Sequence, residues 1–291
     1  MLSKPDTQLR VNSTDTLLSF LLRETGNSRT TIKSFLAHRL VAINGTIQTR
    51  HDTPVKVGDT VTISRHRGNQ ELRHPKVRIL FEDANFLIVE KRNGILTVPA
   101  NLKSQETTVF SILKHYVKKQ DVHNGIYCVH RLERETSGLL IWTKTVELQQ
   151  YMREYWDQLI RCRGYVALVV GNMSHPEGDI RTWISEDPQT GMLISSPTPN
   201  DGKAAHTHYR VIRQNEQYAL LELQVEGANQ IRAHMASIAH PIVGDHKFAH
   251  ADSSPIDRLC LHANRLEFIN PVTEKVVRYE CGTPKELTKW V

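Results

Sequence analysis

The segment Val129–Leu140 holds the ionisable side chains best placed to do chemistry. It reads VHRLERETSGLL, so Glu133 lies in a polar segment that leads through Thr136 and Gly138 into an apolar run typical of a strand. A carboxylate in a loop beside a rigid strand can serve as a nucleophile or as a general base. The pattern therefore indicates a polar loop that presents the Glu133 carboxylate beside a strand.

Two other arrangements of side chains could also do chemistry. Glu133 and Glu135 would point the same way in an extended loop, as a glycosidase pair does, but no sugar-binding aromatic platform accompanies them. His206 and His208 offer two metal ligands from one strand face, yet the sequence shows no third ligand nearby. Both the glycosidase pair and the metal site are weak signals.

Composition argues against several classes of protein. The cysteines, Cys128, Cys162, Cys260 and Cys281, form no CxxC pair, which predicts reduced thiols and no structural zinc. No GxGxxG or Walker loop is present, so a nucleotide cofactor is disfavoured. No apolar run approaches the ~20 residues of a membrane helix, and the N-terminus has no secretory signal. We expect a cytoplasmic protein without membrane contact.

Strands dominate the pattern from Val77 onward. Gly138 and Gly244 are expected to meet a backbone requirement, either a close approach or a positive φ. The expected strands are 79–81, 86–89, 139–142, 165–170, 209–212 and 218–225, and the expected helices are 107–117, 148–155 and 229–239. Trp142, Trp156 and Trp183 are expected in the core. Adjacent strands with interspersed helices predict an α+β domain around an antiparallel or mixed sheet.

The first quarter of the chain forms a separate, basic pattern. Residues 1–70 contain ten Lys or Arg against five Asp or Glu. A helix capped by Ser13 or Asp15, a second helix capped by Ser28, and short strands around the Asn44-Gly45 turn are expected there. Residues 65–78, with five basic side chains and one acidic, are typical of a linker. We predict domains at 1–70 and 79–291, joined by a linker at 71–78.

The segment SRTTIKSFLAHRLVAING resembles the S4 RNA-binding domain, a small α/β fold. The resemblance implies that Arg29, Lys33, His38 and Arg39 dock on structured RNA. Basic side chains on one helix face can follow phosphates, with an affinity that falls steeply as salt rises. The alternative is a solvated helix face that binds nothing.

The segment Val129–Leu140 resembles the second motif of the RluA-type pseudouridine synthases, in which HRLD-x-x-TSG presents a catalytic aspartate. The likeness runs along nearly all of residues 77–280. The other matching segments are Glu90–Gly94 for the first motif, Tyr165 for the active-site tyrosine, and Gln230–Arg232 with His234 and His240–Asp245 for the third motif. The resemblance implies a mixed, mainly antiparallel sheet with flanking helices.

The family converts uridine to pseudouridine by breaking a C–N glycosidic bond and rejoining the base through carbon. The resemblance implies that Glu133 is the reacting carboxylate, that Tyr165 stacks on the base, and that Arg232 pairs with the carboxylate. Arg131 would help to extrude the target nucleotide, because a base inside a helix must be flipped out to be reached. Ile231 and Thr136 are the remaining residues implied to bind substrate.

The resemblance also implies partners and cofactors. The substrate would be structured RNA, ribosomal or transfer RNA, and the enzyme would be a monomer with neither metal nor cofactor. A glycosylase that breaks the bond without rejoining it is disfavoured, since no base for activating water is visible.

Three positions depart from the family pattern. Glu133 stands where the family has Asp, Arg92 where it usually has Pro, and the loop at 226–229 is two residues shorter and lacks the usual Thr and Arg. The longer side chain moves the carboxylate by up to about 1 Å, which can cost ~100-fold in rate. We therefore expect a synthase with reduced activity or a retuned site. The alternative is a catalytically inactive RNA-binding homologue that acts in RNA folding or ribosome assembly.

Overall fold

The structure, a computed structural model, describes residues 7–37, 40–63, 72–101, 103–189, 191–226, 230–248 and 256–291. The chain divides into two compact units. The first comprises Met1–Leu72 with Leu113–Gly125, and the second comprises Arg73–Ile112 with Ile126–Val291. Among the described residues, no helix has the length and apolar character needed to cross a membrane.

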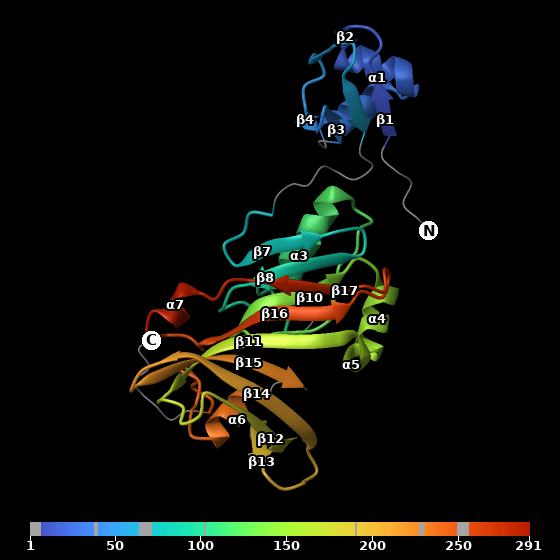
Figure 1. The fold of residues 1–291 in the computed structure, drawn as a ribbon. Helices are drawn as coiled ribbons and strands as arrows, with labels where there is room; N and C mark the ends of the chain where they lie inside the picture. Colours follow the sequence, from blue (N-terminus) through green and yellow to red (C-terminus); the bar gives the residue numbers. More distant parts are fainter. Residues whose placement is uncertain are drawn as a thin grey trace. The chain divides into compact units, whose positions relative to one another are not determined.

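The N-terminal part of the first unit forms two short helices and a small antiparallel sheet (Figure 1). Its strands are β1 (Thr7–Arg10), β2 (Asp15–Thr16), β3 (Val41–Ile43), β4 (Thr46–Gln48), β5 (Pro54–Val55) and β6 (Thr60–Ile63), and its helices are α1 (Leu17–Thr25) and α2 (Arg29–Ala37). The sheet order is β1-β6-β3-β4, and β2 pairs with β5. Asn44 and Gly45 both have positive φ at the β3–β4 turn, as expected for an Asn-Gly hairpin.

The start of α1 corrects one prediction. Thr16, rather than Ser13 or Asp15, is the N-cap, and its Oγ1 accepts from the Ser19 N–H at 3.3 Å. Asp15 is instead engaged by Arg23, whose NH1 lies 2.7 Å from the Asp15 carboxylate. Ser28 does precede α2 as predicted, and its Oγ accepts from the Thr31 N–H at 3.1 Å. Competition for Asp15 by a charged partner explains the shift.

The second unit is built on one large mixed sheet (Figure 1). Its strands are β7 (Val77–Glu82), β8 (Phe86–Lys91), β9 (Tyr127–Cys128), β10 (Ser137–Thr143), β11 (Ile160–Val170), β12 (Glu177–Glu186), β13 (Leu193–Ser196), β14 (Lys203–Gln214), β15 (Tyr218–Glu226), β16 (Leu261–Ile269) and β17 (Val276–Glu280). The order is β13-β12-β14-β15-β11-β16-β10-β8-β7, with β17 beside β16 and β9 beside β10. Strands β10 and β16 pair in parallel, whereas β11 pairs antiparallel with both β15 and β16.

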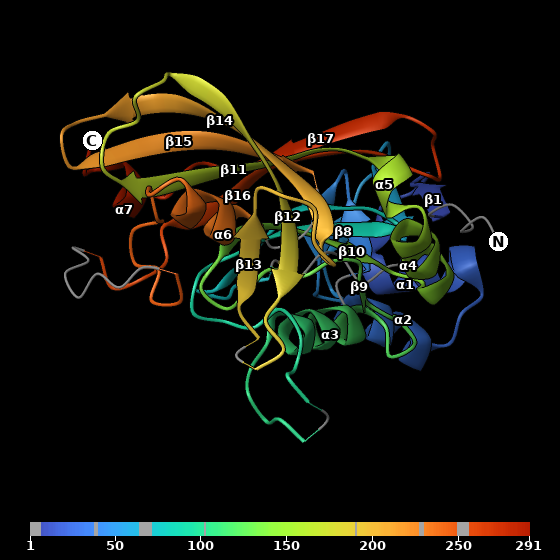
Figure 2. The ribbon, with the colours of Figure 1, turned by 90° about the horizontal axis from the view of Figure 1, so that it is seen from below.

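Five helices complete the described chain. They are α3 (Val109–Gln120), α4 (Val146–Glu154), α5 (Trp156–Leu159), α6 (Ile231–Ser237) and α7 (Lys285–Thr288). Helix α6 lies against the sheet near the β12–β13 hairpin (Figure 2). It is shorter than the predicted helix at 229–239, because Ile238 ends it with a non-helical ψ of 17°. Residues 227–229 lie outside the described residues, and so does most of the loop predicted to be shortened.

Close approach between β10 and β16 depends on one glycine. Gly138 has φ +126°, and a Cβ there would lie 2.2 Å from the Ala263 carbonyl oxygen. The parallel pair Gly138–Ala263 therefore tolerates no side chain at position 138. Because every residue of β10 is buried, the strand forms a rigid base for the loop that precedes it.

Candidate active site

A cleft of about 300 Å³ opens beside the loop that leads into β10. Strand β11, the end of β15 and the start of α6 supply the rest of its wall. The lining residues are His130, Arg131, Leu132, Glu133, Thr136, Trp156, Arg163, Tyr165, Val225, Gln230, Ile231, Arg232 and Leu261. The volume is at the lower end of the range for small-molecule sites, and it is mixed in polarity, as a site for a polar ring would be.

Arg232 joins two carboxylates at the edge of this cleft. Its NH1 donates to Glu133 Oε2 at 2.5 Å. Its Nε and NH2 donate to the two oxygens of Asp245 at 2.8 and 2.6 Å. Arg232 is the second residue of α6, and Glu133 lies in the loop before β10. Two segments 99 residues apart in sequence therefore meet here. The two hydrogen bonds from Nε and NH2 to Asp245 fix the plane of the guanidinium group and direct NH1 toward Glu133.

Asp245 is the buried end of this ion-pair chain. Its side chain is fully buried, whereas that of Glu133 is 40% exposed. Burial alone would raise the pKa of Asp245, but the hydrogen bonds and charge of Arg232 lower that pKa overall. The backbone N–H groups of Lys247 and Phe248 also donate to Asp245 Oδ1. Asp245 is therefore a stable anion that anchors Arg232, and Glu133 is the carboxylate open to the cleft.

Tyr165 and Arg163 reach the cleft from the same face of β11, two residues apart. Burial raises the pKa of the Tyr165 phenol, the positive charge of Arg163 opposes that shift, and the charge of Glu133 adds to it. Tyr165 is therefore a neutral phenol at physiological pH. Its ring offers an aromatic face to a planar base, and its hydroxyl can donate or accept a proton.

The loop that carries Glu133 is pinned at both ends. Thr97 Oγ1 donates to the Leu132 carbonyl at 2.8 Å and accepts from the Leu132 N–H at 3.2 Å. The Thr136 N–H closes a turn on the Glu133 carbonyl at 3.2 Å. His130 Nε2 accepts from the Ile141 N–H at 3.1 Å, and burial lowers the pKa of His130 to about 3. The neutral imidazole thus ties the loop to β10.

A buried lysine supports the same loop from below. Lys91 is fully buried, and its Nζ donates to the carbonyls of Arg92, Ile95 and Arg134. The Arg134 carbonyl directly follows Glu133, so the ammonium links the first sequence motif to the reactive loop. Burial lowers the pKa of Lys91 to about 7.

Most of the predicted site residues come together in this cleft. Glu133, Tyr165 and Arg232 all line it. Arg131 is exposed at its wall, and Ile231 and Thr136 are buried lining residues. Arg29 and Lys33 belong to the first unit, where both are exposed on α2. His38 and Arg39 lie outside the described residues.

Sequence reasoning missed three residues of the site. Asp245 was assigned to the third motif without a role, although an acidic residue 13 positions after Arg232 was a usable signal. Lys91 belongs to the first motif, and no signal in the sequence indicates that its side chain is buried. Trp156 was expected in the core, but it is half-buried, lines the cleft and lies 5.2 Å from the His130 ring centroid. Trp142 is fully buried, as expected.

The pair His206 and His208 has a local partner. Both rings contact the Asp179 carboxylate, at 2.6 and 3.2 Å. Asp179 lies on β12, beside β14, which carries the two histidines. The cross-strand contact gives both side chains a role on the sheet surface.

Comparison with known proteins follows this geometry. The profile of the family described as RNA pseudouridylate synthase matches residues 85–237, which include Glu133, Tyr165 and Arg232. The chain belongs to this family. The predicted resemblance to RluA-type synthases is thereby confirmed.

Relatives extend the likeness over most of the chain. A protein of Vibrio cholerae, named ribosomal large subunit pseudouridine synthase D, is 29% identical over 90% of this chain and 85% of its own length. An uncharacterised RNA pseudouridine synthase of Bacillus subtilis is 28% identical over 93% of this chain and 90% of its own length. The solved structure of human RNA pseudouridylate synthase domain containing 4 matches with a TM-score of 0.58 at 21% identity, covering 72% of this chain and 90% of that chain. This last match shows that the fold is shared.

Proposed function

We propose that this chain is an RluA-type pseudouridine synthase, an isomerase that acts on a uridine in structured ribosomal or transfer RNA. The observation that supports it most directly is that Glu133, Arg232 and Tyr165 line one cleft, with Arg232 paired both to Glu133 and to the buried Asp245. Family membership supports the reaction, and the geometry supplies residues for it.

The reaction needs one carboxylate, one aromatic ring and one cation. The bond from N1 of uracil to C1′ breaks, C5 bonds to C1′, the C5 proton is lost, and N1 takes up a proton, so the product is an isomer of the substrate. In our proposal Glu133 acts on the ribose as nucleophile or base, and Arg232 stabilises its negative charge. Tyr165 stacks on the uracil and can relay the C5 proton. These steps use no redox change and no net water.

The target nucleotide has to leave its helix before it can enter a cleft of this size. We assign Arg131 to extrusion, because it is exposed at the wall of the cleft next to the Glu133 loop. The buried side chains of Thr136 and Ile231 bound the space where the base would sit. Their contacts to substrate are apolar or through the Thr136 hydroxyl.

We further propose that the first unit is an S4-like RNA-binding domain, with domains at 1–70 and 79–291 and a basic linker at 71–78. Support comes from the helix–helix–strand order of α1, α2 and the β3–β4 hairpin. Arg29 and Lys33 are exposed four residues apart, so they share one face of α2 and can follow phosphates. We also assign His38 and Arg39, which lie outside the described residues, to RNA binding.

Glu133 also favours a second candidate, an RNA-binding homologue with little or no catalysis. The carboxylate is one methylene longer than the aspartate of the family motif, and it is 40% exposed. A misplacement of about 1 Å can cost ~100-fold in rate. The same ion pair supports the enzyme, since Glu133 does reach Arg232.

Tritium release separates the two candidates. RNA labelled at uridine C5, taken from a strain that lacks this gene, should release tritium with the wild-type chain and not with Glu133→Gln. Glu133→Gln keeps the side-chain length but removes the charge. Tritium release by the wild-type chain that is lost in Glu133→Gln, while Glu133→Gln still binds RNA, would support a synthase. No release by the wild-type chain, with RNA binding retained, would support the binding homologue.

A further inference from the structure

Three metal-binding side chain types meet inside the sheet, and none of the three residues lines the cleft. Glu90 is the penultimate residue of β8, His262 lies near the start of β16, and Cys281 directly follows β17. All three are buried, with 4%, 0% and 8% of their surfaces exposed. One ligand atom from each lies within 4.8 Å of the others. Carboxylate, imidazole and thiolate are the ligands that Zn²⁺ accepts in proteins.

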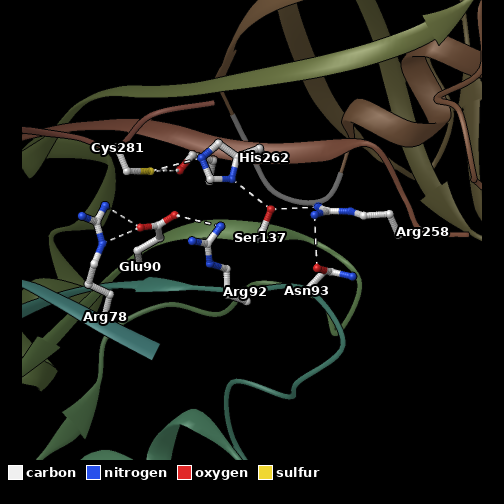
Figure 3. Close-up of polar contacts among 9 residues, drawn as sticks. Arg78, Glu90, Arg92, Asn93, Ser137, Arg258, His262 and Cys281 are labelled. Carbon is white, nitrogen blue, oxygen red and sulfur yellow. Dashed lines mark hydrogen bonds and ion pairs between the residues drawn. The ribbon is translucent and has the colours of Figure 1, made fainter. Parts of the chain in front are cut away.

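His262 is oriented as a metal ligand would be. Its Nδ1 lies 2.9 Å from Ser137 Oγ, and Ser137 in turn accepts from Arg258 NH2 at 2.9 Å (Figure 3). Its Nε2 lies 3.2 Å from Cys281 Sγ (Figure 3). A ligating histidine has its second ring nitrogen held by an oxygen, which fixes the ring. Arg258 also donates to Asn93, so the support extends to the loop after β8.

The charges around Glu90 permit a cation. Arg78 donates to Glu90 Oε2 at 2.9 and 2.7 Å, while Oε1 has only a long contact of 4.0 Å to Arg92. The side chains of Arg78 and Arg92 are 62% and 51% exposed, so water screens their charges. A dication with one thiolate and one carboxylate is neutral. The positive charges nearby therefore do not exclude it.

We propose that Glu90, His262 and Cys281 form a binding site for a divalent transition cation of the zinc class. The metal would bind Oε1, Nε2 and Sγ and release the thiol proton to solvent. The Ala263 carbonyl oxygen, 3.6 Å from Cys281 Sγ, offers a fourth donor. The site departs from the sequence-based expectation of no zinc, which rested on the separation of the cysteines along the chain.

The site would act as a clip within the sheet. It ties the chain after β17 to β16 and β8, and its support, Ser137, follows Thr136 in the wall of the cleft. Bound metal would stiffen the strand ends beneath the Glu133 loop. Thiolate and imidazole ligands disfavour Mg²⁺ and Ca²⁺, which prefer oxygen ligands.

Cobalt titration of the full-length, reduced chain tests the site. Co²⁺ should produce a thiolate-to-cobalt absorption band in the near ultraviolet that saturates at one metal per chain and is displaced by Zn²⁺. Cys281→Ser should abolish the band, whereas the control Cys128→Ser, at a half-buried thiol outside the proposed site, should keep it. Absence of the band in the wild-type chain, or its survival in Cys281→Ser, overturns the proposal.

Two further measurements protect the test against misfolding of Cys281→Ser. Glu90→Gln retains the thiolate, so the band should remain while the affinity for Co²⁺ falls about tenfold or more. An unchanged affinity would contradict the three-ligand site. Zn²⁺ should also raise the Tm of the wild-type chain and of Cys128→Ser by a few degrees, and Mg²⁺ should not. Equal effects of the two metals would overturn the proposal as well.

Discussion

Asp245 holds Arg232 with both carboxylate oxygens, and this leaves a single guanidinium nitrogen, NH1, to meet Glu133 at 2.5 Å. Asp245 lies on the buried side of Arg232, so it positions the guanidinium group without lining the cleft. Because its side chain is fully buried, no water can substitute for this contact. The carboxylate in the cleft is thus only as well placed as the Asp245–Arg232 pair beneath it.

Asp245→Asn should therefore lower kcat more than RNA affinity. An amide cannot accept from both guanidinium nitrogens as the carboxylate does, so the Arg232 side chain shifts away from Glu133. We expect this shift to lower the single-turnover rate by about 10- to 100-fold. Tritium release and filter binding measure the two quantities. Asp179→Asn is the matched control, because Asp179 contacts histidines on β14 instead of Arg232. Equal losses of rate and affinity would contradict a positioning role.

Acid should act on the same pair. Because Arg232 lowers the pKa of Asp245 below its ordinary value of 3.8, the pair stabilises the fold at any pH above that value. The contribution is lost only as the pH falls through the lowered pKa. We expect urea unfolding of the wild-type chain and of Asp245→Asn to converge below about pH 4. A difference that persisted undiminished at pH 2 would contradict this assignment.

The length of Glu133 is open to a direct test. Glu133→Asp should raise the single-turnover rate by about 10- to 100-fold, because the shorter side chain withdraws the carboxylate by up to about 1 Å to the position expected in the family. Glu135→Asp makes the same change two residues along and should have no effect. Unchanged release by Glu133→Asp would indicate that the site is retuned for glutamate or limited elsewhere.

How far the sequence predicts this structure depends on how far apart in the sequence the contacting residues lie. Apolar runs such as 86–89 and 139–142 were predicted as strands and lie in β8 and β10. Strands β12 and β13 were not predicted, since half-buried strands such as Glu177–Glu186 carry no clean alternation. The cap of α1 was misplaced because the competition of Arg23 for Asp15 arises only in the fold.

The site shows the same limit. Glu133, Tyr165 and Arg232 were assigned by motif, and they share the cleft. Lys91 was not given a role, because one of its three carbonyl partners, Arg134, lies 43 residues further along the chain. His262 and Cys281, 19 residues apart, had no motif at all. Sequence motifs identify the residues that line the cleft. The contacts that hold those residues in place form only when the sheet brings distant segments together.

Lys91 should make stability depend on pH in the neutral to alkaline range. Burial lowers its pKa from 10.5 to about 7, so between these values the unfolded chain binds a proton that the folded chain lacks. The free energy of unfolding should therefore rise with pH across this window, by up to about 1.4 kcal/mol per pH unit. Lys91→Met should lose this rise.

The same variant leaves three carbonyls without their donor. We expect Lys91→Met to destabilise the fold by about 2–4 kcal/mol at pH 7 and to loosen the loop after Glu133. Urea unfolding at pH 7 and pH 9 gives both quantities. Lys76→Met is a suitable control, because Lys76 is an exposed lysine that donates to the Asn93 carbonyl. A wild-type stability that did not change between the two pH values would contradict the lowered pKa of Lys91.

Gly138 should tolerate no substitution. A Cβ there would lie 2.2 Å from the Ala263 carbonyl oxygen, and φ is +126°, so Gly138→Ala has to separate β10 from β16. We expect a loss of at least about 3 kcal/mol in the free energy of unfolding. Gly282→Ala, where a Cβ meets nothing within 4 Å, should change it by less than about 1 kcal/mol. Comparable losses in the two variants would contradict close strand packing at Gly138.

Salt dependence tests the proposed RNA surface of α2. Arg29→Gln with Lys33→Gln removes two exposed charges from one helix face, so the slope of log affinity against log salt should fall by about 1.5. The weakening should be similar for RNAs of different sequence, because phosphates carry no sequence information. Arg23→Gln is the control, since that arginine already pairs with Asp15 and Glu24 in the same unit. If the double variant kept the wild-type slope, α2 would not contact phosphate, and the affinity would have to come from the cleft or from other basic side chains.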